Sequence, residues 1–159
     1  MDFVDGMLVR RNVGTPFHGL LQVIVGAFFR EFRRSHRITA FTETRLLVDT
    51  KTNRHRIPDV MAVGSPFQKG RVVVDVPAIV VEIKSPDDTF DHIVDRCFDY
   101  QRLGVINILV MDPDNQRAWV FEHGDLRLLT GKSASLSLHD RPALDFPFGD
   151  MFAELEEGE

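Results

Sequence analysis

Two stretches of the chain are apolar along nearly their whole length, and a helical pattern separates them. "AIVVEIK" (78–84) and "VINILVM" (105–111) have the length and the Val and Ile content of buried strands. Strands that are joined through a helix in this way pair in parallel within one sheet. This unit predicts an α/β (α+β) fold in which a mixed β-sheet is flanked by helices.

Local signals predict the first half of the chain. An Asp5-Gly6 turn between apolar pairs predicts an N-terminal hairpin. Thr15 as N-cap and Pro16 at the first helical position begin a helix. Its expected apolar stripe consists of Phe17, Leu21, Ile24, Phe28 and Phe32. "ITAFTETRLLVD" (38–49) and "IPDVMAV" (57–63) are rich in β-branched residues and predict two strands.

The second half follows the same rules. Asp87 or Asp88 is expected to cap the helix between the two apolar strands, and Gly104 to end it. "RAWVFE" (117–122) and "LRLLT" (126–130) predict an antiparallel pair. A further strand and a closing segment are expected after them.

Length and composition indicate the class of protein. With 159 residues, the chain has the size of a single domain covering 1–159. The lone cysteine, Cys97, excludes an internal disulfide and a cysteine-based zinc site. The most apolar stretch, 17–29, is too short to span a bilayer, and no signal-peptide pattern precedes it. We therefore expect a cytoplasmic protein without a membrane role.

Charge is distributed unevenly along the chain. The net charge of -5 argues against a protein that coats nucleic acid by bulk electrostatics. Arginines nevertheless crowd the first third, while acidic residues gather at the C-terminus. This distribution allows a basic face on an acidic protein; the alternative is a solvated helix surface together with an acidic tail.

Two charged residues interrupt the first apolar strand. Glu82 and Lys84 project from one face of the strand, because side chains alternate, and Ile83 faces the other layer. Burying either charge without a partner is expensive, so packing alone does not explain them. Asp59, which follows Pro58 on an earlier strand, reaches the same spot if the two strands are neighbours.

These residue types suit one kind of chemistry. Two converging carboxylates repel each other, and a divalent cation relieves the repulsion. Mg²⁺ prefers one or two carboxylates completed by water and phosphate oxygens, and Mn²⁺ can take its place. A lysine beside such a site can hold a water or a developing negative charge. The combination describes hydrolysis of a phosphodiester.

The spacing Pro58-Asp59 followed by Glu82-Ile83-Lys84 resembles the PD-(D/E)XK motif of restriction-endonuclease-like nucleases. Wider stretches, "HRIPDVMAV", "PAIVVEIKSPDDTFDHIVDRCFDYQRLGVINILVMDP" and "AWVFEHGDLRLL", are similar to the Uma-two family of restriction-type endonucleases. The family pattern is matched at Glu82, Ser85-Pro86, Arg96, Tyr100, Gly104-Val105 and Asp112-Pro113. The resemblance covers essentially the whole chain.

The resemblance implies a Mg²⁺- or Mn²⁺-dependent DNA endonuclease. Asp59, Glu82 and the backbone carbonyl of Ile83 would bind the metal, and Lys84 would assist the attacking water. Many family members carry a lysine on the helix, where this chain has Arg96, and none on the strand. Arginine stays protonated, so we assign Arg96 to a phosphate or carboxylate clamp and the lysine role to Lys84.

Three further residues are accessory candidates. His18 is either a neighbour of the metal site or a residue of the helix N-terminus near the core. Glu43 could reach the site from an adjacent strand, although a surface ion pair with Arg45 is the simpler interpretation. Tyr100 lies four residues after Arg96 on one helix face, which suits packing with one hydrogen bond as well as substrate contact.

Other functions stay open at the level of sequence. The fold could serve as a catalytically inactive binding or regulatory module, or it could hydrolyse another phosphate substrate such as a nucleotide. Glu82 and Lys84 could instead form a structural ion pair. The resemblance also allows a homodimer, because restriction-like nucleases often pair to cut two strands.

Overall fold

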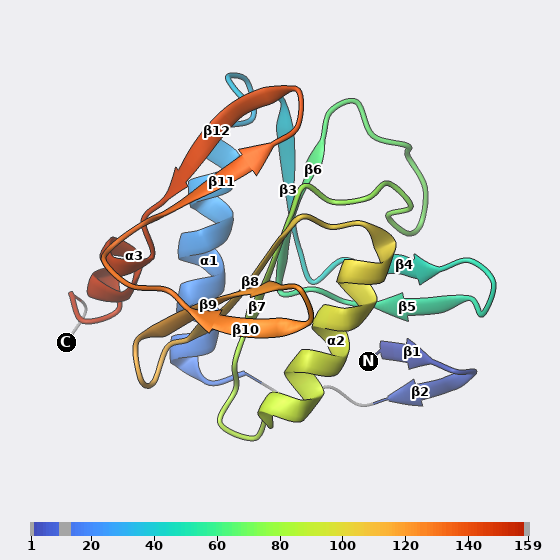
Figure 1. Ribbon diagram of the computed structural model, residues 1–159, viewed down its shortest axis with the longest axis horizontal. Helices are drawn as coiled ribbons and strands as arrows, with labels where there is room; N and C mark the ends of the chain where they lie inside the picture. The colour runs from blue at the N-terminus through green and yellow to red at the C-terminus, as the bar shows by residue number, and fades with distance from the viewer. Residues whose placement is uncertain (1, 10–13, 158–159) are drawn as a thin grey trace.

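The computed structural model describes residues 2–9 and 14–157. A six-stranded sheet forms its centre, with the strand order β10-β9-β8-β7-β6-β3 (Figure 1). The bounds are β3 (Ile38–Thr42), β6 (Val60–Gly64), β7 (Ile79–Ile83), β8 (Asn107–Asp112), β9 (Arg117–Glu122) and β10 (Asp125–Leu128). β7 and β8 pair in parallel and the other neighbours are antiparallel, which confirms the predicted mixed sheet.

Two helices use alternate side chains of β7. Val81 packs in one apolar cluster with residues of α1 (Pro16–Glu31), and Val80 packs in another with residues of α2 (Phe90–Leu103). β7 is therefore covered by helices on both faces, as its apolar sequence predicts. The remaining hairpin, β11 (Ala134–Leu138) with β12 (Arg141–Phe146), and α3 (Phe148–Glu154) join the cluster of α1.

A second sheet has the order β2-β1-β5-β4. β1 (Asp2–Val4) and β2 (Met7–Val9) form the predicted hairpin around Asp5-Gly6. The single strand predicted over 38–49 is wrong, because Glu43 has a φ of 46° and divides it into β3 and β4 (Leu46–Asp49), which belong to different sheets. β5 (Arg54–Arg56) was not predicted because its sequence is entirely polar. The strand predicted over 57–63 begins only at Val60.

The first helix has the predicted start and a different buried face. The Thr15 side chain accepts a hydrogen bond from the His18 amide, and Pro16 is the first helical residue. The buried residues are His18, Leu21, Val25 and Phe29, whereas Phe17 is 39% exposed. The helix carries apolar residues around much of its circumference, so periodicity alone misplaced the stripe by about one residue.

The N-cap of the second helix lies one residue after Asp88 and two after Asp87, the two predicted caps. Thr89 is the N-cap, and its side chain accepts a hydrogen bond from the His92 amide. Asp88 instead accepts a hydrogen bond from the Ser85 amide in the preceding turn. Gly104 ends the helix at a φ of 106°, as predicted. No helix in the described part of the chain is long and apolar enough to cross a membrane.

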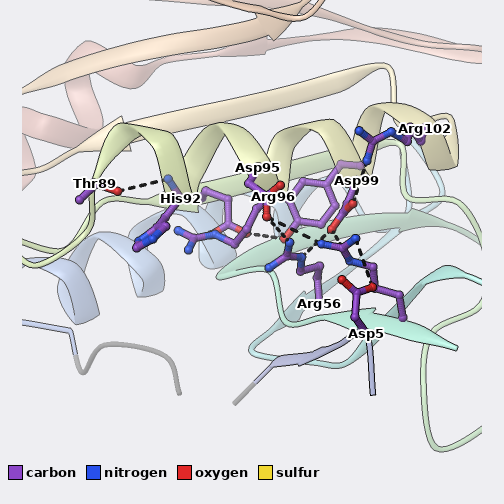
Figure 2. Close-up of polar contacts among 11 residues, drawn as sticks. Asp5, Arg56, Thr89, His92, Asp95, Arg96, Asp99 and Arg102 are labelled. Carbon is purple, nitrogen blue, oxygen red and sulfur yellow. Dashed lines mark hydrogen bonds and ion pairs between the residues drawn. The ribbon is translucent and has the colours of Figure 1, made fainter. Parts of the chain in front are cut away.

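A buried ion network joins β5 to α2 (Figure 2). Arg56 donates to the Asp99 carboxylate at 2.7 Å and to the Asp95 carboxylate at 2.8 Å. Arg54 Nε lies 3.1 Å from Asp99 as well, and Arg102 reaches the other Asp99 oxygen at 3.2 Å. Arg56 and Asp99 are only 5% and 4% exposed, so each depends on the other for its charge to be compensated.

We expect Arg56→Ala to lower the free energy of unfolding by about 3–5 kcal/mol, because it leaves Asp99 buried with less compensation. Arg102→Ala is the matched control, since Arg102 contacts the same carboxylate from a mostly exposed position and should change stability by less than about 1 kcal/mol. Urea unfolding measures both. Equal losses would show that the network does not distinguish buried from exposed arginines.

Candidate active site

Asp59 lies at the start of β6 and is attached to β7. Its side chain is 1% exposed, and Oδ2 accepts a hydrogen bond from the Ile83 amide at 2.7 Å. Its backbone carbonyl accepts hydrogen bonds from Gln22 Nε2 at 2.9 Å and from the Glu43 amide at 3.3 Å. The sequence motif therefore does bring Asp59 against the peptide that follows Glu82.

Glu82 is fully buried and its side chain points toward α2. Its Oε1 accepts a hydrogen bond from the Tyr100 hydroxyl at 2.5 Å, and its Oε2 lies 3.5 Å from Arg96 Nε. A carboxylate at this depth requires both a compensating charge and hydrogen-bond donors. α2 supplies both from positions four residues apart on one face.

Arg96 is a fixed positive charge between two carboxylates. It is 11% exposed, and Nη2 lies 3.8 Å from Asp88 Oδ1, in addition to the contact with Glu82. Burial acts to lower the pKa of Arg96, but the nearby carboxylates of Glu82, Asp88 and Asp59 outweigh it and raise that pKa. Arg96 therefore stays protonated. Its guanidinium lies near two carboxylates, and its role as a phosphate or carboxylate clamp stays a prediction.

Lys84 immediately follows the last residue of β7. Its amide donates to the Met111 carbonyl at 2.8 Å, its Nζ lies 3.3 Å from the Ser85 carbonyl, and its ammonium lies 5.9 Å from the centroid of the Phe90 ring on α2. Glu82 and Lys84 thus both face α2, as strand alternation predicts. The cation in contact with Glu82 is Arg96.

The three accessory candidates are placed differently from one another. His18 is buried, with Nε2 3.4 Å from Asp59 Oδ1, so it is both a residue of the first helical turn and a neighbour of the site. Tyr100 is fully buried, and its hydroxyl donates a hydrogen bond to the Glu82 carboxylate. Glu43 lies in an exposed loop, and only its backbone contacts Asp59. Glu43 and Arg45 form no ion pair within the described residues.

Two residues beside the site were missed from sequence. Gln22 follows His18 by one helical turn, and a polar pair at that spacing in an apolar helix is the signal that could have found it. Asp88 was interpreted as a helix cap, whereas its carboxylate also lies near Arg96.

Cys97, between Arg96 and Tyr100 in sequence, shows how little water reaches this region. Burial, and then the charge of Glu82, raise the pKa of its thiol. A buried thiol in this state is neutral and unreactive. Cys97 is therefore a packing residue of α2.

The residues partly fit a divalent cation. Asp59 and Glu82 are hard oxygen donors, and Mg²⁺ in proteins is often held by one or two carboxylates with water and phosphate completing the shell. Among the residues that the structure describes, no group of three His, Cys, Asp or Glu side chains is placed to hold a metal. Asp59 and Glu82 are the hard side-chain donors discussed for such a site.

The profile of the Uma2 family, described as "Putative restriction endonuclease", matches residues 1–145. The chain belongs to this family. A crystal structure of "a putative nuclease belonging to DUF820" from Anabaena variabilis is similar, with a TM-score of 0.77 and 16% identity over 97% of this chain and 90% of that chain. This likeness shows that the two proteins share a fold.

A second solved structure, the DrdV–DNA complex, has a TM-score of 0.43 and 14% identity, and the match covers 90% of this chain and 13% of that chain. No curated protein matches the chain. Membership of the Uma2 family supports a nuclease of the restriction-endonuclease type, as the sequence resemblance implied.

We expect Tyr100→Phe to lower the free energy of unfolding by about 1.5–3 kcal/mol, because it removes a hydrogen bond to a buried carboxylate. The loss should shrink when Glu82→Gln is already present, and a double-mutant cycle from urea unfolding measures that coupling. If Tyr100→Phe costs the same in both backgrounds, the hydroxyl does not stabilise the charge of Glu82.

Proposed function

We propose that this protein is a Mg²⁺- or Mn²⁺-dependent DNA endonuclease with a PD-(D/E)XK site. The observation that carries the proposal is the hydrogen bond from the Ile83 amide to Asp59, which joins the aspartate after Pro58 to the Glu82-Ile83-Lys84 segment. Family membership supports the nuclease class. DNA as the substrate extends the family description to this chain.

In this proposal Asp59, Glu82 and the backbone carbonyl of Ile83 hold the metal ion. When bound, the ion would polarise the phosphodiester and lower the pKa of a nearby water. In hydrolysis, the oxygen of water bonds to phosphorus, one ester P–O bond breaks, and the leaving oxygen gains a proton. The protein must therefore place a water and stabilise negative charge.

The side chains divide these tasks. The Ile83 amide fixes Asp59, and Tyr100 with Arg96 fixes Glu82, so both carboxylates are oriented before substrate arrives. Lys84 has no carboxylate partner among the described residues, and its assigned role is to position the attacking water or help to deprotonate it.

One observation favours the alternative of a binding module without turnover. Glu82 already receives the Tyr100 hydroxyl and the Arg96 charge, so its carboxylate is compensated without a metal. A nuclease fold that has lost catalysis could keep these contacts for stability alone. Metal binding and DNA cleavage therefore need separate measurements.

The first measurement is metal-dependent stability. An ion that binds only the folded state at about 100 times its Kd adds about 2.7 kcal/mol, which for a chain of this length raises Tm by roughly 5–10 °C. We expect Mg²⁺ or Mn²⁺ to produce this shift, and Asp59→Asn or Glu82→Gln to remove most of it. Asp114→Asn, an exposed acidic residue, is the control and should retain the shift.

Cleavage is tested on the same proteins. Purified protein is incubated with single- and double-stranded DNA, with Mn²⁺ or with a chelator, beside Asp59→Asn and Glu82→Gln. Cutting by the wild type alone supports the nuclease. Stabilisation by metal without cutting of any DNA over a wide pH range supports the binding module, and cutting that persists in both variants points to a contaminant.

Substitutions of Lys84 and Arg96 should affect different properties, the cleavage rate and the stability respectively. We expect Lys84→Ala to slow single-turnover cleavage at saturating DNA by about 10²–10⁴-fold, because it removes a group that acts on the attacking water, with little change in Tm. Arg96→Ala should lower stability by about 3–5 kcal/mol, because it leaves Glu82 less compensated. Lys51→Ala, in the exposed β4–β5 turn, is the control for loss of a lysine.

The comparison can also reverse the assignment. Suppose that Arg96→Ala folds at the assay temperature and slows the chemical step more than Lys84→Ala does. Arg96 on α2, and not Lys84, would then be the residue that acts on the attacking water. Single-turnover rates at saturating DNA separate this result from weaker binding.

A further inference from the structure

A second charged feature lies at the opposite end of the central sheet from Asp59. β6 begins after Asp59 and ends at Gly64, where Ile38 of β3 pairs with it. α1 runs alongside, with His18 of its first turn beside Asp59, so the far end of α1 is close to the far end of β6 (Figure 1). The sixteen residues of α1 span about 24 Å.

At this far end, basic residues line two adjoining hollows. We call the set the basic patch; its members are Arg30, Arg33, Arg34, Arg37 and Lys69. Arg33 and Arg34 line both hollows, so the positive charge is continuous between them. All five side chains are exposed, and within residues 2–9 and 14–157 none of them forms an ion pair. Glu31 is the acidic residue that lines the patch.

Side chains that suit phosphate oxygens line one of the hollows or, in the case of Arg141, adjoin a lining residue. Thr39 and Ser65 contribute hydroxyls that lie 2.9 Å apart. Arg141 donates from Nη2 to the Ser65 carbonyl at 3.3 Å, and its buried Nε has no hydrogen-bond partner within the described residues. A Cβ on Gly64 would lie 2.7 Å from Arg141 Nη2, so the glycine makes room for this extra positive charge.

We propose that the basic patch binds the phosphate backbone of a nucleic acid, as a contact separate from the candidate active site. On a chain of net charge -5, five clustered cations that form no ion pair within the described residues outnumber the single lining acid, Glu31, and repel one another, and a polyanion relieves this repulsion. The cations are spread over two open hollows, which suits successive phosphates better than one small anion. The identification of this polyanion as DNA rests on the proposed endonuclease function.

The geometry sets a minimum length for the substrate. A span of about 24 Å corresponds to roughly seven base-pair steps of B-form DNA at about 3.4 Å each. A duplex held at both places must therefore extend about seven base pairs from the phosphodiester that is cut. The patch positions the backbone and carries no sequence information of its own.

The test measures binding of the full chain to a 20-base-pair duplex by fluorescence anisotropy, with a chelator present so that no cleavage occurs. The patch variant is Arg33→Gln/Arg34→Gln/Lys69→Gln. The control is Lys51→Gln/Arg127→Gln/Lys132→Gln, which removes three exposed positive charges outside the patch. Circular dichroism and Tm establish that both are folded.

We expect the patch variant to bind about 10- to 100-fold more weakly than the control at physiological salt, with a salt slope smaller by about 2–3. Undetectable binding by the wild type, or equal losses in patch and control variants, would overturn the proposal. So would displacement of the DNA by micromolar inorganic phosphate, which would indicate a small-anion site. Because the assay contains no metal, a failure of cleavage leaves this result intact.

Discussion

The buried carboxylate of Glu82 is the constraint on which the arrangement of β7 and α2 depends. A charge at the centre of a sheet is tolerated only where neighbouring elements deliver donors and an opposite charge. Tyr100 and Arg96 do this from one face of α2. Asp95 and Asp99 on the same helix receive Arg54 and Arg56 of β5. α2 therefore joins the central sheet to the second sheet through charges as well as through its apolar stripe.

The two ends of the central sheet carry different sets of charged residues. Asp59 and Glu82 lie at one end, and the basic patch lies at the other. The five cations of the basic patch are exposed, so salt screens their charge beyond a Debye length of about 8 Å at physiological ionic strength. The net charge of the chain thus says little about how strongly the basic patch attracts a phosphate. That attraction depends on the charges close to it.

Sequence patterns predicted the elements that are governed by local chemistry. The β7-α2-β8 unit followed from two apolar runs, and Thr15, Pro16 and Gly104 marked helix ends by their own conformational preferences. The break at Glu43 could not be predicted in this way, because a non-glycine residue at positive φ has no compositional signal. β5 is held by ion pairs with a helix about forty residues away, which no local pattern contains.

The same limit applies to the candidate site. The motif predicted that Asp59 would reach the spot shared by Glu82 and Lys84 if the two strands are neighbours. The strands do pair, and Asp59 lies against the Ile83 amide. The motif could not predict which cation would meet Glu82, since Lys84 is two residues away in sequence and Arg96 is fourteen. The crossover of α2 over β7 decides this question, and it brings Arg96 to Glu82 while Lys84 lies against Ser85 and Phe90.

Arg96 and Lys84 lie in different surroundings and therefore suit different roles. The Arg96 guanidinium lies 3.5 Å from the Glu82 carboxylate, and its positive charge offsets the cost of burying that carboxylate in the folded protein. An arginine whose pKa is raised further cannot act as a base, so its contribution is permanent charge. Lysine is the cation that can exchange a proton in proteins, and Lys84 is only half-buried at the end of β7. The fixed positive charge beside Glu82 is thus supplied by Arg96, whereas the Lys84 ammonium lies near Ser85 and Phe90 at the end of the strand.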